Sequence, residues 1–309
     1  MPGSNLRSPR ISVVVPHLNQ PDHLARCLAA LAAGHRRPDE IFVVDNGSDV
    51  LPDDVCAAHA AVTLLVELEP GPGPARNSGV AASSGEILAF IDADCTASPE
   101  WLAVAEREMA DPGAQILGGD VRIAVADPYR LTPIEAYESE YAYRMDRYIA
   151  REGFTGTGNL VVRRAIYDAI GPFGALDIAE DRDWGQRATA QGYAIRYVPE
   201  LRVFHPARPD FAEIFRKWDR QTAHDYARAL GQRAGRTRFA IKTVAMGGSP
   251  LAEIPRILAS NRIQGARTRG LAFIALTRIR LYRAWRMLRL LLRGDHADLS
   301  RGWNRGRAR

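Results

Sequence analysis

The chain has few cysteines and lacks the signals of secreted and membrane-spanning proteins. Its 309 residues contain three cysteines, Cys27, Cys56 and Cys95, and no pair of them has CxxC spacing. This excludes a disulfide scaffold and a zinc ribbon and favours a reducing compartment. The first ten residues contain two prolines and two arginines, and the apolar run at 11–15 is too short for a signal peptide. No uninterrupted apolar run reaches the roughly 18 residues of a transmembrane helix, so we expect a cytoplasmic protein.

Two nucleotide-binding signatures are also missing. No GxGxxG follows the first apolar run, which argues against a dinucleotide-binding fold, and no GxxxxGK occurs, which excludes a P-loop. With 46% apolar and 25% charged residues, the composition is that of a globular protein and excludes global disorder.

Charge is unevenly distributed along the chain. The formal net charge is +5, but residues 1–210 hold 19 basic and 30 acidic side chains, whereas residues 211–309 hold 22 basic and 6 acidic ones. The sequence therefore predicts an acidic body followed by a strongly basic region. A basic region of this kind binds phosphate, on lipid or nucleic acid, or pairs with an acidic partner.

Apolar, β-branched runs alternate with segments of helical periodicity through the first hundred residues. The expected strands are 11–16, 41–45, 62–67 and 87–92, and the expected helices are 21–34, 52–61 and 74–83. This alternation predicts an α/β fold with a mostly parallel, Rossmann-like sheet flanked by helices. A mixed extension of the same sheet is expected next, with helices at 99–110, 132–150 and 177–191 and strands at 115–125, 160–163, 193–197 and 201–204.

Polar residues follow three of the expected strands. His17 and Asn19 follow the first strand, Asp45 ends the second, and Asp92 and Asp94 follow the fourth. Each group alone is also good turn or helix-capping chemistry. Together they indicate a ligand site, because ligands of parallel sheets bind beyond the carboxyl ends of the strands. Two carboxylates one residue apart can hold a hard divalent cation such as Mg²⁺ or Mn²⁺, which is often shared with substrate phosphates.

A glycine- and proline-rich loop at 70–74 opens the third expected helix, and Arg76 lies in its first turns. Free backbone N–H groups at a helix start favour an anion, and a guanidinium adds a permanent charge with bidentate geometry. A plain turn before a helix would explain the glycines but not Arg76.

These elements together resemble the family 2 inverting glycosyltransferases of the GT-A fold, over about residues 10–230. The matching segments, in the family's order, are Val13-Val14-Val15-Pro16 with Asn19, Val43-Val44-Asp45-Asn46-Gly47-Ser48, Ala75-Arg76-Asn77-Ser78-Gly79, Phe90-Ile91-Asp92-Ala93-Asp94, Thr157-Gly158-Asn159-Leu160 and Glu180-Asp181. The resemblance implies a GT-A nucleotide-sugar-binding and catalytic domain in residues 1–210, with a helical basic extension in residues 211–309.

The resemblance also implies roles for single residues on the donor side. Pro16, His17 and Asn19 would line the base and ribose. Asp45 would hydrogen-bond the base, as the family's aspartate does with uracil, and Arg76 would contact the base or the diphosphate. Asp92 would contact the ribose or the metal, Asp94 would be the main ligand of Mn²⁺ or Mg²⁺, and His205 would be a further ligand. For His205, a partly buried histidine at the sheet edge is an equal alternative.

On the acceptor side, the resemblance makes Asp181, in the pair Glu180-Asp181, the general base of a single displacement. The same acidic residues would also complement a helix N-terminus, a role compatible with catalysis. The sugar and acceptor pocket would be shaped by Gly156, Thr157, Gly158, Asn159 and Trp184.

Two departures from the family pattern are visible. Many relatives have Asp-Asp-Gly-Ser after the second strand, and this chain has Asn46 at the second position. Processive members carry Gln-x-x-Arg-Trp on a later helix, and residues 215–221 lack it. We therefore expect transfer of one sugar per encounter.

The basic region predicts an amphipathic helix over residues 271–292. One face would carry Phe273, Ile274, Leu281, Trp285, Leu288, Leu291 and Leu292, and another would carry Arg278, Arg283, Arg286, Arg289 and Arg293. A basic amphipathic helix with Trp at its border indicates binding to an anionic membrane surface through 271–293. Packing on the catalytic body or on a second subunit is the alternative. Nucleic acid is not an expected partner, because no reader motif accompanies the charge.

The leading hypothesis is a metal-dependent inverting glycosyltransferase that moves one sugar from a UDP-linked donor. Its acceptor would be a glycan or a lipid-linked sugar of bacterial surface polysaccharide synthesis, at the inner face of the cell membrane. A sugar-phosphate nucleotidyltransferase is the alternative enzyme class, but its phosphate loop needs Gly and Lys, and residues 16–22 contain neither. A non-catalytic glycan- or membrane-binding relative is the third hypothesis, and the intact Asp92, Asp94 and Asp181 argue against it.

Overall fold

The computed structural model describes residues 8–176 and 179–293. The chain divides into two compact units, one formed by 1–124 with 143–206 and the other by 125–142 with 207–309. The second boundary lies near the expected division at residue 210. Residues 125–142 belong with the C-terminal region, however, so the sheet unit is assembled from two separate pieces of chain.

One eight-stranded sheet forms the centre of the first unit, in the order β3-β2-β1-β4-β7-β6-β8-β5. Its strands are β1 Ile11–His17, β2 Glu40–Asp45, β3 Val62–Val66, β4 Ile87–Ile91, β5 Thr96–Ala97, β6 Ile116–Ala124, β7 Asn159–Arg163 and β8 Ile195–Pro206. β1 to β4 are parallel, as predicted, and β6 runs parallel to β8. β7 runs antiparallel to its neighbours β4 and β6, so the loop before β7 reaches the edge where β4 ends.

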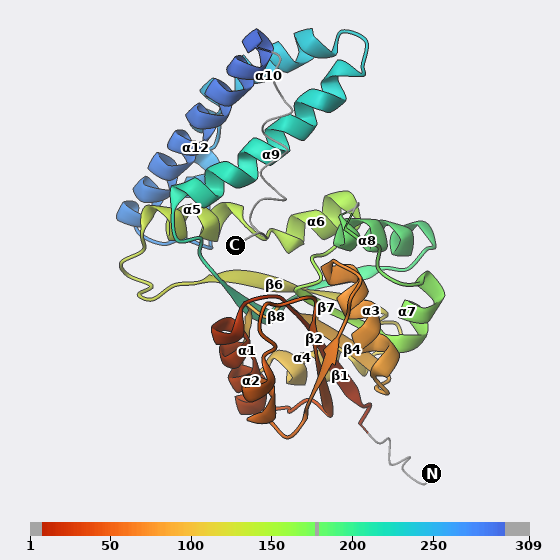
Figure 1. The fold of residues 1–309 in the computed structure, drawn as a ribbon. Coiled ribbons are helices and arrows are strands. Elements are labelled where there is room, and N and C mark those ends of the chain that lie inside the picture. The colour runs from red at the N-terminus through yellow and green to blue at the C-terminus, as the bar shows by residue number, and fades with distance from the viewer. Residues whose placement is uncertain (1–7, 177–178, 294–309) are drawn as a thin grey trace. The chain divides into compact units, whose positions relative to one another are not determined.

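Helices cover both faces of this sheet (Figure 1). One face is covered by α1 Pro21–Ala33, α2 Asp53–Ala57 and α4 Trp101–Met109, and the other by α3 Pro72–Ala82, α7 Arg164–Ile170 and α8 Glu180–Ala190. Alternate side chains of β1 enter opposite layers, with Val13 and Val15 in one core and Val14 in the other. This is the period of two that a strand buried on both faces requires. The sequence therefore predicted the layers correctly.

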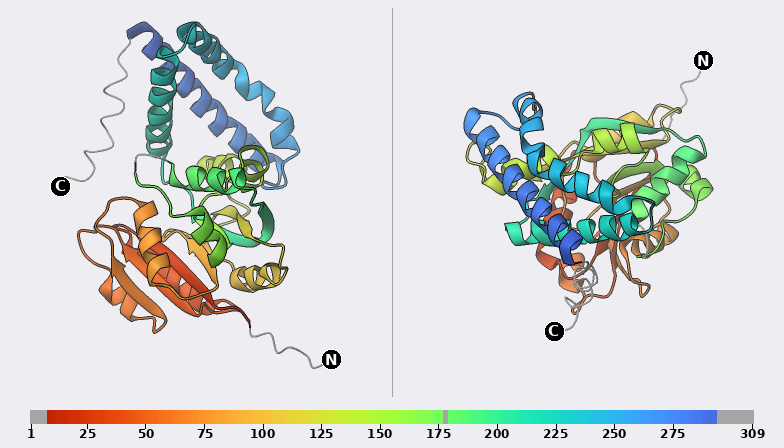
Figure 2. Two further views of the ribbon diagram at one scale, coloured as in Figure 1. Left: turned by 90° about the vertical axis from the view of Figure 1, so that its right-hand side faces the viewer. Right: turned by 90° about the horizontal axis from the view of Figure 1, so that it is seen from above.

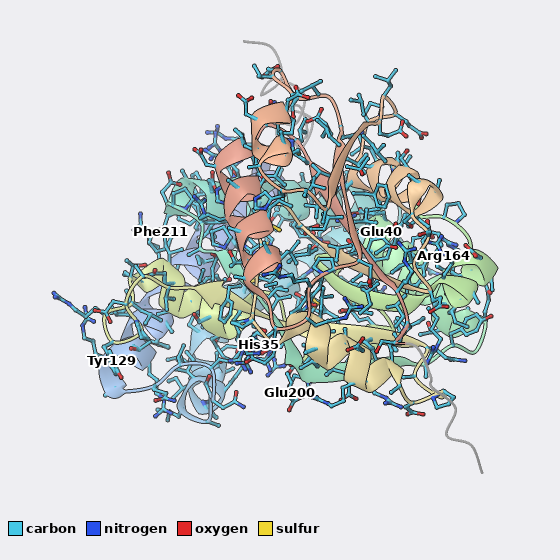
Figure 3. All side chains as sticks on the ribbon, turned by 90° about the horizontal axis from the view of Figure 1, so that it is seen from below. His35, Glu40, Tyr129, Arg164, Glu200 and Phe211 are labelled. Atoms are coloured by element: carbon cyan, nitrogen blue, oxygen red, sulfur yellow. The ribbon has the colours of Figure 1, made fainter. Side chains whose placement is uncertain are left out.

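The amino ends of the parallel strands are closed by two charged side chains (Figure 3). Glu40 accepts hydrogen bonds from the backbone N–H of Ser84 and Gly85, and Arg164 donates to the carbonyl of Gly85 at 2.7 Å. Both therefore hold the turn before β4. This leaves the opposite edge of the sheet for a ligand.

Several expected boundaries are wrong. The helix predicted at 132–150 is two helices, α5 Pro133–Tyr141 and α6 Met145–Glu152, because Ala142 is extended and Tyr143 has a left-handed φ of 49°. The strands predicted at 193–197 and 201–204 are one strand, β8, with a register shift opposite Gly119 and Asp120. Neither α7 nor β5 was predicted. The helix expected from 177 begins at Glu180, and residues 177–178 lie outside the described part of the chain.

The second unit is helical. It consists of α5, α9 Phe211–Leu230, α10 Gly235–Ala252, α11 Ile254–Leu258 and α12 Ala266–Arg293, and α9, α10 and α12 are its three long rods (Figure 2). Ile134 and Tyr137 of α5 pack with Leu276 and Ile279 of α12, which explains why residues 125–142 join this unit. Over residues 8–176 and 179–293, no helix is long and apolar enough to cross a membrane.

The predicted faces of the last helix need correction. α12 has an inner apolar face, with Leu276, Ile279, Met287 and Leu290 buried, and a separate outer stripe. The outer stripe consists of Ile274, Leu281, Trp285, Leu288 and Leu292, each between 48% and 77% exposed. Arg283 is not on an outer basic face: it is buried, with its guanidinium 3.7 Å from the centre of the Trp218 ring.

Candidate active site at the carboxyl ends of the strands

Two carboxylate-bearing segments meet at the carboxyl edge of the sheet around a glycine loop. Asp92 follows β4, and Glu180 and Asp181 are the first residues of α8. A Cβ on Gly158 would lie 2.5 Å from Oδ2 of Asp92, and one on Gly156 would lie 4.0 Å from Oδ2 of Asp181. The loop therefore lies against both carboxylates, and a side chain at position 158 would force Asp92 to shift.

Asp94 faces His205 of β8. Asp94 Oδ2 lies 3.2 Å from His205 Nε2. The Nδ1 atom of His205 lies 2.7 Å from the carbonyl oxygen of Pro206, which can only accept, so Nδ1 carries a proton. Burial alone would raise the pKa of Asp94 and lower that of His205, but their hydrogen bond and mutual attraction outweigh it, so the pKa of Asp94 is lowered and that of His205 is raised.

This pair fits a divalent cation. Asp94 Oδ1 is buried and makes no hydrogen bond within the described chain, so one carboxylate oxygen is left for a ligand. Because the carbonyl of Pro206 keeps a proton on Nδ1, loss of the Nε2 proton would leave the lone pair of Nε2 available to a cation on the Asp94 side. No cluster of three or more His, Cys, Asp or Glu arranged for a metal occurs among the residues described. Mg²⁺-type sites often use one or two carboxylates and take the remaining ligands from phosphates and water.

Arg76 is buried beside this pair, with 3% of its side chain exposed. Its Nη2 donates to Asp92 Oδ1 at 2.6 Å, and its Nη1 donates to Glu180 Oε1 at 3.0 Å. Burial alone would lower the pKa of Arg76, but these two carboxylates raise it. In this geometry the guanidinium holds β4 and α8 together and is not open to a diphosphate.

Asp181 is half-buried at the start of α8. Burial raises its pKa, and the negative charge of Glu180 raises it further, against a hydrogen bond from the Arg182 backbone N–H at 2.7 Å. A carboxylate with a raised pKa is a stronger base than a free one. Glu180 is occupied by Arg76, so of the two acidic residues Asp181 is better suited to accept a proton.

His17 and Asp45 form a second buried pair, at 2.9 Å between Nδ1 and Oδ2. The other oxygen of Asp45 accepts from the backbone N–H of Gly47 and Ser48, and the residue is fully buried. Asp45 is thus committed to the turn after β2 and is closed to a nucleotide base in this structure. Asn19, by contrast, is exposed next to the half-buried Pro16.

Asn46 explains one departure from the family pattern. Its Nδ2 donates to the carbonyls of Glu67 and Glu69, and its Oδ1 accepts from the backbone N–H of Gly71. An aspartate could not donate to those carbonyls. Asn46 therefore joins the end of β2 to the loop that opens α3.

Two residues expected in an acceptor pocket are core residues instead. Asn159 is fully buried: it donates to the carbonyls of Asp120 and Leu201 and accepts from the Trp101 indole N–H. Trp184 is 1% exposed and packs on Tyr167 and Phe173. Thr157 is also buried, and Gly156 and Gly158 of the same loop lie close to the carboxylates of Asp181 and Asp92.

The sequence did not single out Tyr143. Its hydroxyl lies 2.9 Å from His205 Nε2, and its ring lies 4.6 Å from the imidazole ring, centre to centre. The left-handed φ of 49° that ends the preceding helical segment places it there. Such backbone strain clusters at functional sites. No motif signals it, because the contact depends on a backbone conformation that non-glycine residues rarely adopt.

Comparisons with known proteins identify the family and the fold. The profile of the family described as glycosyl transferase family 2 matches residues 12–171. Glycosyltransferase AglE of Haloferax volcanii is 33% identical over 217 residues, which span 68% of this chain and 70% of AglE. The pre-mycofactocin glycosyltransferase of Mycobacterium tuberculosis is 27% identical over 206 residues, which span 64% of this chain but only 43% of that protein.

Solved structures show the same fold. A mannosyltransferase from Pyrobaculum calidifontis, in complex with GDP-Man and Mn²⁺, has a TM-score of 0.56 at 18% identity, covering 94% of this chain and 89% of its own. Glucosyl-3-phosphoglycerate synthase from Mycobacterium tuberculosis, in complex with Mn²⁺ and UDP, has a TM-score of 0.50 at 21% identity, covering 67% and 75%. The fold is therefore the expected GT-A fold. On the profile match and the likeness to AglE, the chain belongs to glycosyl transferase family 2 and is a glycosyltransferase.

Proposed function

We propose that this glycosyltransferase is metal-dependent and inverting and moves one sugar per encounter from a UDP-linked donor to a glycan or lipid-linked acceptor. The main support for the proposal is that two carboxylates of the site are suited to different tasks. Asp94 has one oxygen without a hydrogen-bond partner in the described chain and faces His205, so it is suited to bind a cation. Asp181, which lies close to Gly156 of the glycine loop, has a raised pKa, so it is suited to accept a proton.

The proposed reaction is a single displacement. The acceptor oxygen forms its bond to the anomeric carbon while the bond from that carbon to the diphosphate oxygen breaks, so the configuration inverts. Asp181 takes the hydroxyl proton, and the nucleoside diphosphate leaves with the electron pair. Asp94, His205 and Asp92 would hold Mn²⁺ or Mg²⁺, which, when bound, neutralises charge on the diphosphate. Arg76 acts through Asp92 and Glu180 as a positioning residue.

Uridine is proposed as the base on the family resemblance and on the UDP bound to one solved relative. Another solved relative holds GDP-Man. Asp45 does not support a choice between them, because both its oxygens are bonded inside the protein. The exposed Asn19 and the half-buried Pro16 remain the proposed contacts for the nucleoside.

The Asp94→Ala variant tests the metal site. We expect Mn²⁺-dependent affinity for UDP to fall at least tenfold, since second-sphere changes alone cost metal sites 10–100-fold, and Asp94 is a direct ligand in the proposal. Isothermal titration calorimetry with and without Mn²⁺ measures this, and Asp54→Ala, an exposed aspartate of α2, is the matched control. Unchanged Mn²⁺-dependent affinity in Asp94→Ala would remove Asp94 from the metal site.

Tyr143→Phe tests how the hydroxyl acts on His205. The phenol occupies Nε2, the nitrogen that a cation needs, and this hydrogen bond must break when the metal binds. Removing a hydrogen bond of about 1 kcal/mol should therefore tighten Mn²⁺ binding about fivefold while the ring keeps its stacking on the imidazole. Calorimetric titration with Mn²⁺ alone measures the change. Weaker binding in Tyr143→Phe would show instead that the hydroxyl positions the ligand.

We further propose that the outer stripe of α12 attaches the protein to an anionic membrane surface. The stripe is apolar over five exposed residues, and the exposed Arg278, Arg289 and Arg293 lie on the same helix. This is the arrangement of an interfacial helix. Arg286 and Arg280 are engaged by Asp219 and Glu253 within the helical unit, so part of the basic charge is structural.

Changing Trp285 and Leu288 together to serine tests this surface. Each large apolar side chain contributes about 1.5–3 kcal/mol when fully buried, so the double variant should lose at least tenfold in partitioning into phosphatidylglycerol-rich vesicles. Co-sedimentation of the full chain at low salt measures it. Leu68→Ser, which changes an 85% exposed leucine of the sheet unit, is the control. Equal sedimentation of the double variant and the unaltered protein would contradict the proposed surface.

A further inference from the structure

The helical unit contains an apolar pocket that the proposed chemistry does not use. It lies between α11 and the first two turns of α12 and has a volume of about 380 Å³. Its lining consists of Ile254, Ile257, Leu258, Ala266, Arg269, Gly270 and Phe273. Ordered water in a cavity needs several polar partners, and this lining offers few. The pocket therefore suits a hydrocarbon ligand better than water.

The lining is also exposed to solvent. Leu258 is 60% exposed and Ile254 is 38% exposed, although both line the pocket. Leu251, three residues before Ile254, and Ile274, which follows the lining residue Phe273, are 69% and 61% exposed. Exposed apolar groups around a concave apolar site mark a ligand site or an interaction surface. An apolar chain could enter through such a rim without crossing a polar barrier.

The segment that lines the pocket carries only positive charge. Residues 254–273 contain four arginines and no acidic residue. Arg256 is neutralised by Glu140 and Glu253. Arg269 lines the pocket. Among the residues that the structure describes, its buried Nε has no hydrogen-bond partner, and its Nη2 donates to the carbonyl of Ser260 at 3.5 Å. A guanidinium with a spare donor at an apolar pocket is complementary to an anionic head group that carries a hydrocarbon chain.

We propose that this pocket binds one hydrocarbon chain of an anionic membrane lipid, with Arg269 donating to the lipid phosphate. The proposal rests on the membrane attachment proposed above and deepens it. The outer stripe of α12 would bind the membrane surface without selecting a particular lipid. The pocket would then bind one hydrocarbon chain of a single lipid in that membrane. The ligand class is thus an amphiphile with both a chain and a phosphate, and neither part alone should suffice.

Monomeric dodecyl phosphate is the probe, titrated into the full chain below its micelle concentration and followed by calorimetry. We expect saturable binding with one site per chain. Inorganic phosphate should not bind at the same concentrations, and dodecyl maltoside, which has the chain but no charge, should bind at least tenfold more weakly. Arg269→Gln should weaken dodecyl phosphate about tenfold and leave dodecyl maltoside unchanged. No saturable binding of dodecyl phosphate, or equal binding of the two amphiphiles, would overturn the proposal.

Gly270→Phe is the sharper variant, because a Cβ at Gly270 meets nothing within 4 Å and a phenyl ring can therefore occupy the pocket. Gly248→Phe is its matched control: Gly248 also lies in a helix, its Cβ also meets nothing within 4 Å, and it does not line the pocket. We expect Gly270→Phe to abolish dodecyl phosphate binding and Gly248→Phe to retain it, with equal thermal stability. Retained binding in Gly270→Phe would contradict the pocket.

Different results would contradict the membrane-binding stripe of α12 and the lipid pocket between α11 and α12. If the Trp285 and Leu288 variant loses vesicle binding but keeps dodecyl phosphate, both proposals hold as stated. If the unaltered protein does not bind vesicles yet binds dodecyl phosphate, the membrane attachment fails and so does the assignment of the ligand to a membrane lipid, whereas a site for an amphiphilic phosphate remains. UDP-sugar turnover should be unchanged in Gly270→Phe, so loss of the pocket is distinguishable from loss of the enzyme.

Discussion

Asp181→Asn is expected to lower the turnover number by a factor of about 10² to 10⁴, the range that a positioned general base contributes. Asparagine keeps the size and polarity of the side chain but cannot accept the proton of the attacking hydroxyl. Mn²⁺-dependent affinity for UDP should persist, because Asp94 and His205 are untouched. Release of UDP from the donor, with an acceptor or with water, measures turnover. Asp183→Asn, in the same helical turn and paired with Arg187, is the control and should remain active.

The raised pKa of Asp181 adds two pH effects with opposite consequences. Activity should fall as the pH drops through this pKa, because the protonated acid is no base, so the acid limb lies above the ordinary aspartate value of 3.8. The free energy of unfolding depends on pH in the opposite direction to activity. Between the unfolded and the folded pKa the folded protein binds more protons, so the contribution of Asp181 to the free energy of unfolding declines as pH rises through this window. At pH 7 Asp181→Asn should therefore be as stable as the unaltered protein or more stable. A marked loss of stability, or unchanged turnover, would contradict the role of Asp181.

Arg76→Met is expected to cost about 3 kcal/mol of the free energy of unfolding, the lower end of the 3–5 kcal/mol for breaking a buried ion pair. The lower end applies because the Asp92 side chain is 38% exposed and water can solvate part of the stranded charge. Glu180, at 20% exposed, would be left without its partner. Urea unfolding measures the loss. Arg107→Met, which removes a 61% exposed arginine paired with Glu108, is the control and should change stability by no more than about 0.5 kcal/mol.

Affinity for UDP separates this role from direct contact with the donor. If Arg76 positions Asp92, Arg76→Lys should recover part of the stability, because an ammonium can still pair with one carboxylate. If Arg76 contacts the diphosphate instead, Arg76→Met should weaken UDP without loss of stability. That second result would contradict the buried ion-pair role.

Short-range sequence patterns predicted the sheet and placed two carboxylates at its ligand edge. The apolar, β-branched runs and their alternation with helical segments depend only on neighbours in sequence, and the parallel strands that they predict are confirmed. Asp92 and Asp94 could be placed because a buried strand, Ile87–Ile91, ends immediately before them. In a parallel sheet the end of such a strand lies at the ligand edge whatever the rest of the fold does.

Contacts between distant segments could not be predicted. Asn159 lies in and Trp184 lies near segments that resemble the family's motifs, yet partners from β6, β8 and α7 bury them in the core. The same helical period fits both the inner and the outer face of α12, so sequence merged two stripes into one. Tyr143 was missed because its place depends on one left-handed residue.

We propose above all that Asp94 and its neighbours bind a nucleotide sugar together with a divalent cation. The most direct measurement is the thermal unfolding temperature in the presence of UDP-, GDP- and dTDP-sugars, with and without Mn²⁺. We predict that UDP-sugars raise it only when Mn²⁺ is present and that Asp94→Ala abolishes the rise. If no nucleotide sugar raises the unfolding temperature in the presence of Mn²⁺, or if the rise is equal in Asp94→Ala, a nucleotide-sugar and cation site at Asp94 is contradicted.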